Sequence, residues 1–262
     1  MDLNLKDKVV IVTGGAKGIG KAIVIALAKE GAIPVIVGRR QSDNEKVKTE
    51  VEALGGQAFC IEAELSLPQT CKVVAEQTLA QFGRIEGLVN NAGQNDGIGL
   101  ENGDYEGFLR SYHKNVVHYY LLAHYALDAL KKTKGSILNI SSKTAETGQG
   151  GTSGYAASNG ARNALTREWA VELLSYHIRV NAIIVAECAT PQYDSWIQTL
   201  DNPEATLKKI TDRIPFENRM TTAEEIAHTA VFLLSERSSH TTGQLIHIDG
   251  GYVHLDRALI TE

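Results

Sequence analysis

The stretch Thr13-Gly14-Gly15-Ala16-Lys17-Gly18-Ile19-Gly20 joins a β-branched run, Val9–Thr13, to an amphipathic segment at residues 21–29. The run is typical of a strand buried on both faces, and residues 21–29 have the apolar spacing of a helix. Glycines at such a junction let the backbone turn tightly and approach a pyrophosphate, to which the helix N-terminus offers free amides and its positive dipole end. Ordinary turns also use glycine clusters, but between a strand and a helix the pattern predicts a dinucleotide site. Its phosphate contacts are expected from Gly14, Gly18, Ile19 and Gly20.

Short apolar runs and longer amphipathic segments alternate along the rest of the chain. Strands are predicted at residues 9–13, 34–37, 57–63, 85–89, 135–140, 178–185 and 244–248. Helices are predicted at residues 21–29, 45–54, 68–82, 105–130, 155–175 and 224–234. This alternation indicates an α/β fold, a Rossmann-like, doubly wound parallel sheet of about seven strands with helices on both faces. Because we find no linker, we expect residues 1–262 to form a single domain, with residues 187–220 as a substrate lid.

The composition is that of a globular protein. Of the 262 residues, 43% are hydrophobic and 22% are charged, and the formal net charge is −5. The negative charge argues against a nucleic-acid surface, and no apolar stretch has the length of a membrane span. The first eight residues lack the apolar core of a signal peptide, and the three cysteines are widely spaced. We therefore expect a cytoplasmic protein without a bound metal.

Further motifs follow the glycine turn in a fixed order. The fourth predicted strand leads into Asn90-Asn91-Ala92-Gly93, Ser142 follows the fifth, and Tyr155 stands thirteen residues after Ser142. With the glycine turn, these motifs resemble the short-chain dehydrogenase/reductase family over about residues 8–251. The resemblance implies hydride transfer to or from a nicotinamide cofactor. It places Asn91, Ala92 and Gly93 at that cofactor.

The resemblance also implies roles for the catalytic residues. Tyr155 would be the general acid/base, Ser142 would hold the substrate oxygen, and Asn115 would anchor a water in a proton relay. This chemistry is sensible in itself, because oxidation of an alcohol needs a base for the hydroxyl proton and a donor for the developing oxyanion. A phenol has an unperturbed pKa of about 10, so it works near neutrality only beside a positive charge.

One position of the family pattern bears on that charge. The family carries a Lys four residues after the Tyr, and here Asn159 stands in its place. Its amide can bond ribose hydroxyls or a water, but it supplies no charge. We expect a rate near neutrality lowered by about 10²–10⁴-fold, an alkaline-shifted enzyme or a non-catalytic cofactor-binding relative, and we expect Asn159→Lys to raise turnover. Lys143 is the other candidate cation, unless it is a solvated loop lysine.

The ends of the cofactor are assigned from neighbouring positions. Val185 replaces the Pro of the family's late motif and still permits a backbone contact with the nicotinamide amide, near which Thr190 also fits. No acid ends the second strand, and Lys17 and Arg39 are placed to pair with a 2′-phosphate, which favours NADP over NAD. The alternative is that both cations are ordinary solvated surface charges. Asp43 or a backbone contact would then serve NAD, so NAD stays open as the cofactor. Glu64 and Leu65 resemble the family's Asp-Leu pair at the adenine. Tyr155 and Asn159 are included among the cofactor contacts.

Residues 142–145, 148–155, 186–187 and 249–259 resemble the L-fucose (aldose) dehydrogenase branch of the family. This implies carbohydrate metabolism, in which a sugar's anomeric hydroxyl is oxidised to a lactone. Gln149 and Glu187 would bond sugar hydroxyls, while Tyr193 and Trp196 either stack on the sugar or pack within the lid. Reduction of a steroid or 3-oxoacyl ketone stays open, because one fold carries many substrates.

The two longest predicted helices, residues 105–130 and 155–175, resemble those through which the family assembles. Apolar residues on more than one face permit a homo-oligomer, a dimer or a homotetramer. The residues that carry this expectation are Leu121, Leu122, Trp169 and Leu173.

Overall fold

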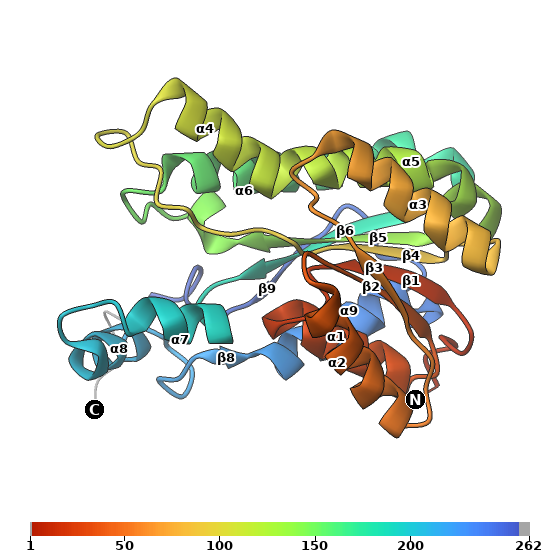
Figure 1. Ribbon diagram of the computed structural model, residues 1–262. Coiled ribbons are helices and arrows are strands. Elements are labelled where there is room, and N and C mark those ends of the chain that lie inside the picture. The colour runs from red at the N-terminus through yellow and green to blue at the C-terminus, as the bar shows by residue number, and fades with distance from the viewer. Residues whose placement is uncertain (1, 257–262) are drawn as a thin grey trace.

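The computed structural model describes residues 2–256. Within them, seven parallel strands form one sheet in the order β3-β2-β1-β4-β5-β6-β9, which Figure 1 shows from the side. The strands are β1 (Val9–Thr13), β2 (Ile33–Gly38), β3 (Phe59–Glu62), β4 (Gly87–Asn90), β5 (Ser136–Ser142), β6 (Arg179–Val185) and β9 (Leu245–Ile248). Residues 257–259, part of one stretch that resembles the aldose dehydrogenases, lie outside the described residues.

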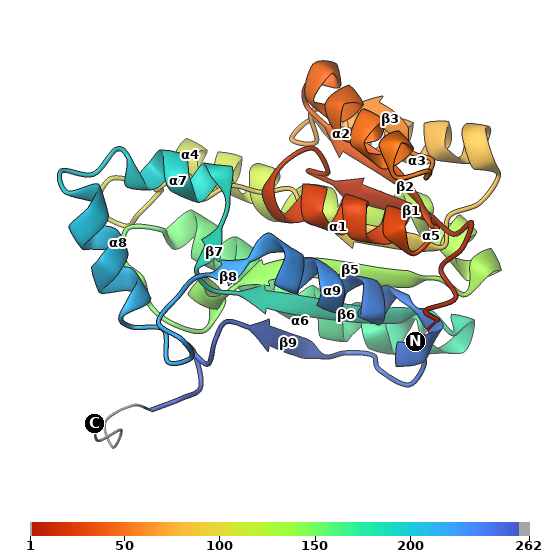
Figure 2. The same ribbon diagram turned by 90° about the horizontal axis from the view of Figure 1, so that it is seen from below.

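Helices cover both faces of the sheet. In Figure 1, α3 (Pro68–Phe82), α4 (Tyr105–Tyr112), α5 (His118–Thr133) and α6 (Ser153–Glu172) lie above it. Below it lie α1 (Gly18–Lys29), α2 (Gln41–Ala53) and α9 (Ala223–Leu234), which Figure 2 shows from their own side. The predicted fold class is thereby confirmed. Among residues 2–256, none of the helices combines the length and the apolar character needed to cross a bilayer.

The order of the strands fixes where a ligand binds. From β1 the chain moves outward to β2 and β3 and then returns to the other side of β1 to form β4. In open α/β sheets ligands bind at the carboxyl ends of the strands beside such a reversal. The glycine turn and the Asn90–Gly93 segment follow β1 and β4, so both lie at this point.

The core explains why the first strand consists of apolar residues up to its last position. Val10 and Val12 pack into the cluster that contains α1 and α9, whereas Val9 and Ile11 pack into the cluster on the opposite face with α3 and α5. All four are at most 1% exposed. Each such side chain contributes about 1.5–3 kcal/mol through burial, so the strand is stabilised from both sides.

Two features differ from the sequence-based expectations. The helix predicted at residues 105–130 is interrupted by a π-helical turn, η1 (His113–Val117), between α4 and α5. The apolar spacing continues through this turn, so periodicity did not reveal it. Three of the four residues expected at an oligomer interface, Leu122, Trp169 and Leu173, are instead core residues with 7% exposure or less. That part of the expectation is wrong, because those residues face the sheet.

Residues 187–220 contain more regular structure than their composition suggests. They include α7 (Pro191–Ile197) and α8 (Pro203–Thr211). The segment leaves the body of the protein at β7 (Cys188–Ala189) and returns at β8 (Thr221–Thr222), and these two short strands pair in parallel. The base of the insert is therefore held by backbone hydrogen bonds. Three short 3₁₀ turns complete the fold: η2 (Lys143–Ala145), η3 (Leu174–Tyr176) and η4 (Glu236–Ser238).

The hydroxyl of Thr13 joins the two segments that meet at the strand reversal. Its Oγ1 donates to the Val89 carbonyl (3.2 Å) and accepts from the N–H groups of Asn91 (2.8 Å) and Ala92 (3.0 Å). The Asn91 side chain in turn donates to the Thr13 carbonyl (2.8 Å). Because Thr13 is fully buried, water cannot replace these contacts.

Thr13→Val is therefore expected to lower the free energy of unfolding by about 1–3 kcal/mol, because it keeps the shape but leaves the N–H groups of Asn91 and Ala92 without this acceptor. Urea unfolding followed by circular dichroism measures this. The matched control is Thr78→Val, since the equally buried Thr78 hydroxyl only donates to the Val74 carbonyl of its own helix. Equal losses in both variants would contradict the role given to Thr13.

Candidate active site at the carboxyl ends of the strands

The glycine turn has the shape of a phosphate cradle. Gly14 and Gly18 have left-handed backbone conformations, with φ of 64° and 51°. A Cβ on Gly20 would lie 2.2 Å from the Gly14 carbonyl oxygen, so the turn closes only without a side chain there. Helix α1 has no side-chain cap at Lys17 and no acid in its first turn, which leaves its first amides open. The turn therefore fits the pyrophosphate of a dinucleotide.

The nicotinamide end is bordered by residues from three other elements. A Cβ on Gly18 would lie 3.3 Å from the Thr190 side chain, so the start of α7 lies against the glycine turn. Val185 ends β6 and stands beside Ser142 in the register of β5 and β6. The predicted contacts Thr190 and Val185 thus lie at the same edge as the glycines. Gly93 is held close to the Asn115 side chain, since its Cβ would approach Asn115 Oδ1 to 2.9 Å.

The two cations predicted for a 2′-phosphate are largely exposed, and each faces a carboxylate. Lys17 lies 2.9 Å from Asp43, and Arg39 lies 3.9 Å from Glu64. The hydrogen bond from Lys17 is the main reason why the pKa of Asp43 is lowered. Leu65 is buried beside Glu64. The two ion pairs thus lie around the carboxyl ends of β2 and β3.

Asn159 is fully buried in α6, and its amide is engaged inside the helix. Its Nδ2 donates to the Tyr155 carbonyl (2.9 Å), and its Oδ1 accepts from the Arg162 guanidinium (2.8 Å). We expected this amide to bond ribose hydroxyls or a water. In the structure both ends of the amide have protein partners, and its contact with a ribose or a water stays a prediction.

Arg162 is a site residue that the sequence analysis missed. Its side chain is 3% exposed and donates to the carbonyls of Asn115 (2.6 Å) and Ile140 (3.1 Å) as well as to the Asn159 amide. The guanidinium carbon lies 4.3 Å from the ring centre of Tyr119 and 5.9 Å from that of Tyr155. No carboxylate within residues 2–256 forms an ion pair with it. A buried positive charge thus stands beside the predicted acid/base.

A sequence signal for Arg162 existed. Positions 155, 159 and 162 follow the spacing i, i+4, i+7, which places them on one face of a helix. An arginine on a helix is normally expected to be exposed to solvent. Only the packing of α6 against β5 and η1 shows that this one is buried.

Asn115 lies in η1 and is fully buried. Its Oδ1 accepts from the Gln94 N–H (2.8 Å), and its Nδ2 donates to the carbonyls of Gln94 (3.0 Å) and Ser111 (2.9 Å). Its own carbonyl accepts from Arg162. The side chain expected to anchor a water therefore holds the loop after β4 and the π-helical turn together.

The substrate side is built around a buried ion pair. Lys143, expected to be either a second cation for Tyr155 or a solvated lysine, is 7% exposed and pairs with Glu187. The ring of Tyr252 covers its ammonium group at 4.0 Å. Its charge is thus matched by a carboxylate rather than directed at the phenol. Ser142 comes directly before this lysine, and its Oγ accepts from the Thr144 N–H (3.3 Å).

The predicted substrate residues of the insert lie partly around the same pair. Tyr193 lies close to Glu187, and burial, followed by the charge of Glu187, raises the pKa of the Tyr193 phenol far above its usual value. Trp196 meets Tyr193 edge to face at 5.2 Å and stays 45% exposed. Gln149 lies in the exposed loop before α6. The structure thus brings Glu187, Tyr193 and Trp196 together and leaves Gln149 at the surface.

Comparison with known proteins agrees with this geometry. The family model described as "Enoyl-(Acyl carrier protein) reductase" matches residues 14–253. The L-fucose dehydrogenase of Bos taurus is 34% identical over 96% of this chain and 91% of its own length. The 3-oxoacyl-(acyl-carrier-protein) reductase FabG of Thermotoga maritima is also 34% identical, over 96% of this chain and 100% of its own.

Solved structures extend the likeness to three dimensions. The crystal structure of Cj0485 dehydrogenase has a TM-score of 0.95 and 46% identity, and the match covers 100% of both chains. L-Sorbose reductase from Gluconobacter frateurii, solved with NADPH and L-sorbose, has a TM-score of 0.93 and 27% identity, with 98% of this chain and 100% of that chain covered. Relatives named for such different substrates share this fold and its nicotinamide chemistry. The chain belongs to the short-chain dehydrogenase/reductase family of NAD(P)-dependent oxidoreductases.

Proposed function

We propose that this protein oxidises the anomeric hydroxyl of an L-fucose-like aldose to a lactone, with NADP as its preferred cofactor. The observation that carries the proposal is the buried ion pair between Lys143, the residue after Ser142, and Glu187. A fixed donor and acceptor of this kind suit sugar hydroxyls, whereas a steroid or an acyl chain needs apolar walls. The exposed face of Trp196 adds a surface for the C–H face of a sugar ring.

The proposed chemistry divides the work among the residues at the strand ends. When bound, the nicotinamide supplies the acceptor for the hydride that leaves the anomeric carbon. Tyr155 takes the hydroxyl proton, and Ser142 donates a hydrogen bond to the same oxygen as its charge develops. Residues 187–220 serve as the lid, which brings Tyr193 and Trp196 over the sugar and excludes water.

Arg162 is proposed to supply the positive charge that Asn159 does not. A guanidinium inside the protein acts through a medium less polarisable than water, so it stabilises a phenolate at this range more than a solvated charge would. The charge of Arg162 also acts on a second buried group: the pKa of His118 is lowered to about 4, mainly by burial and further by Arg162. Asn159 then has a positioning role, since it joins the guanidinium to the helix turn that carries Tyr155.

A homo-oligomer is also proposed, on a different set of residues from those expected. Large apolar side chains on the outer surface of α5 and around the end of α6 are exposed, among them Tyr120 (51%), Val171 (70%) and Leu174 (56%). Exposed aromatic and aliphatic groups of this kind are typical of subunit contacts.

The substrate assignment is tested by following NAD(P)H absorbance with a panel of aldoses, steroid ketones and 3-oxoacyl thioesters. L-Fucose is expected to be oxidised and its methyl glycoside, which lacks a free anomeric hydroxyl, is not. Reaction only with the ketones would overturn the sugar assignment while keeping the oxidoreductase. Tight cofactor binding without turnover of any substrate would establish a non-catalytic relative.

Arg162→Met is expected to lower kcat/KM near neutrality by about 10²–10⁴-fold and to move the rising limb of the pH–rate profile toward alkaline pH, because the phenolate loses its cation. Arg162→Lys keeps the charge and should retain a profile close to that of the wild-type protein. Cofactor fluorescence titration and thermal melts confirm that both variants are folded. An unchanged profile in the methionine variant would refute the proposal for Arg162.

The buried guanidinium also changes what we expect of Asn159→Lys. A lysine there brings a second positive charge into the same buried space, so the single variant is expected to lose stability and turnover rather than gain them. Combined with Arg162→Met, the lysine should recover activity, because one cation then remains. Kinetics and melting temperatures of the two single variants and the double variant measure this, and simple additivity of their effects would contradict it.

Arg39→Ala is expected to raise KM for NADP about tenfold and to leave KM for NAD nearly unchanged, because a hydrogen bond to a charged phosphate contributes about 1.5–3 kcal/mol and solvent weakens it here. The matched control is Lys48→Ala, which removes a charge on α2 that forms only a weak ion pair with Glu52, with 3.9 Å between Lys48 Nζ and Glu52 Oε1. Equal changes for both cofactors would argue against a 2′-phosphate contact.

A further inference from the structure

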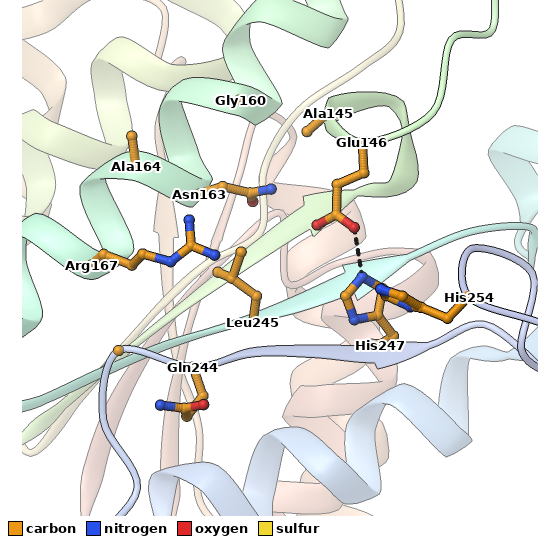
Figure 3. A pocket seen from close by; sticks show the side chains of 11 residues that line it. Ala145, Glu146, Gly160, Asn163, Ala164, Arg167, Gln244, Leu245, His247 and His254 are labelled. Carbon is orange, nitrogen blue, oxygen red and sulfur yellow. Dashed lines mark hydrogen bonds and ion pairs between the residues drawn. The ribbon is translucent and has the colours of Figure 1, made fainter.

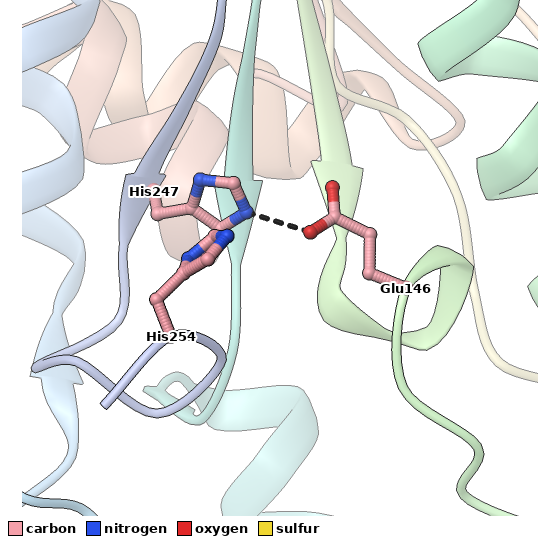
Figure 4. A group of neighbouring side chains, drawn as sticks. All are labelled: Glu146, His247 and His254. Atoms are coloured by element: carbon pink, nitrogen blue, oxygen red, sulfur yellow. Dashed lines mark hydrogen bonds and ion pairs between the residues drawn. The ribbon is translucent and has the colours of Figure 1, made fainter. Parts of the chain in front are cut away.

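Three side chains that could ligate a metal converge outside the candidate active site. Glu146 follows η2, His247 belongs to β9, and His254 comes from the segment after β9, as Figure 4 shows. His247 Nε2 lies 2.8 Å from Glu146 Oε2, and the His247 and His254 rings meet edge to face with 4.3 Å between their centres. One ligand atom from each residue lies within 4.8 Å of the others.

We propose that Glu146, His247 and His254 form a binding site for a divalent transition-metal ion, with Zn²⁺ as the best fit. Two imidazoles and one carboxylate with a fourth position left for water form a ligand set that proteins use for zinc. A tetrahedral ion with ligands at about 2.0–2.2 Å separates neighbouring ligand atoms by about 3.3–3.6 Å. His247 Nε2 and Glu146 Oε2 are 2.8 Å apart, and no two of the three ligand atoms are more than 4.8 Å apart. Small rotations of the side chains would bring the ligand atoms to the spacing of a zinc site.

The surroundings leave room for the ion and its water. The three residues border a groove of about 720 Å³ between the end of η2, α6 and β9, which is shown in Figure 3. The side chains of His247 and Glu146 are 19% and 24% exposed, and His254 is exposed. An ion can therefore reach the ligands from solvent. Imidazole and carboxylate ligands together favour zinc and its neighbours in the first transition series over magnesium or calcium.

The cysteines of the chain do not compete for such an ion. Burial raises the pKa of the Cys60 and Cys71 thiols to about 11 and that of Cys188 to about 12, so they remain protonated near neutrality. A protonated thiol is a poor zinc ligand. No metal was expected from the sequence, because Glu146 is remote in sequence from His247 and His254 and meets them only in the fold, where β6 lies between β5 and β9.

The position of the site gives the ion a structural consequence. Glu146 comes directly after the turn that carries Lys143, and His254 comes two residues after Tyr252, whose ring covers the Lys143 ammonium group. An ion held by both segments joins the loop after Ser142 to the segment after β9. Its binding free energy would add to the stability of that arrangement.

The experiment is a calorimetric titration of chelator-treated protein with zinc chloride. We expect one ion per chain in the wild-type protein and at least about tenfold weaker binding in Glu146→Gln and His254→Ala, since each lacks one ligand. His240→Ala, which removes another exposed histidine, is the matched control and should bind like the wild type.

Two further readouts do not depend on enzyme activity. Zinc should raise the melting temperature of the wild type and His240→Ala but not of His254→Ala, and cobalt should give the visible absorption of a tetrahedral site in the same two proteins. Absence of binding to the wild type, or undiminished binding to both ligand variants, would overturn the proposal.

Discussion

The guanidinium of Arg162 holds together the parts of this protein on which its chemistry depends. From α6 it donates hydrogen bonds to the Ile140 carbonyl near the end of β5 and to the Asn115 carbonyl in the π-helical turn. Taking such an ion out of water costs several kcal/mol, and hydrogen bonds to carbonyls and contact with the Tyr119 ring offset that cost. The charge still lacks a carboxylate partner among residues 2–256. A positive potential therefore remains where Tyr155 begins the helix, and we interpret it as the counterpart of the charge that Asn159 does not provide.

The sheet determines which groups can take part. Because all seven described strands of the main sheet are parallel, their carboxyl ends meet at one edge, where the glycine turn, the Thr13 hydroxyl and Ser142 are found. The insert between β7 and β8 adds Glu187, Tyr193 and Trp196 from the side. We propose that the two buried cations have different roles: Lys143, paired with Glu187, serves the substrate pocket, and Arg162 serves the phenol. The two cations with their different partners support the proposal of a polar substrate.

Much of this arrangement was predictable from local pattern. The seven strands were found because buried parallel strands are continuous apolar runs, and the glycine turn because its spacing is tied to a strand and a helix. The π-helical turn was missed, since apolar residues continue on both sides of it and no glycine or proline marks the interruption. The sequence showed that Asn159 brings no charge to the site. Its hydrogen bonds with the Tyr155 carbonyl and the Arg162 guanidinium were not predicted, because the burial of Arg162 depends on how α6 packs on β5. Likewise, Glu146, His247 and His254 become neighbours only through the order of the strands.

The most direct test of the role given to Arg162 is a double-mutant cycle of kcat/KM with Tyr155→Phe and Arg162→Met. If the guanidinium acts through the phenol, Arg162→Met should lower kcat/KM strongly in the wild-type protein and only slightly in the Tyr155→Phe background. An equal fold-loss in both backgrounds would contradict the account, because Arg162 would then be a structural arginine with no influence on the acid/base.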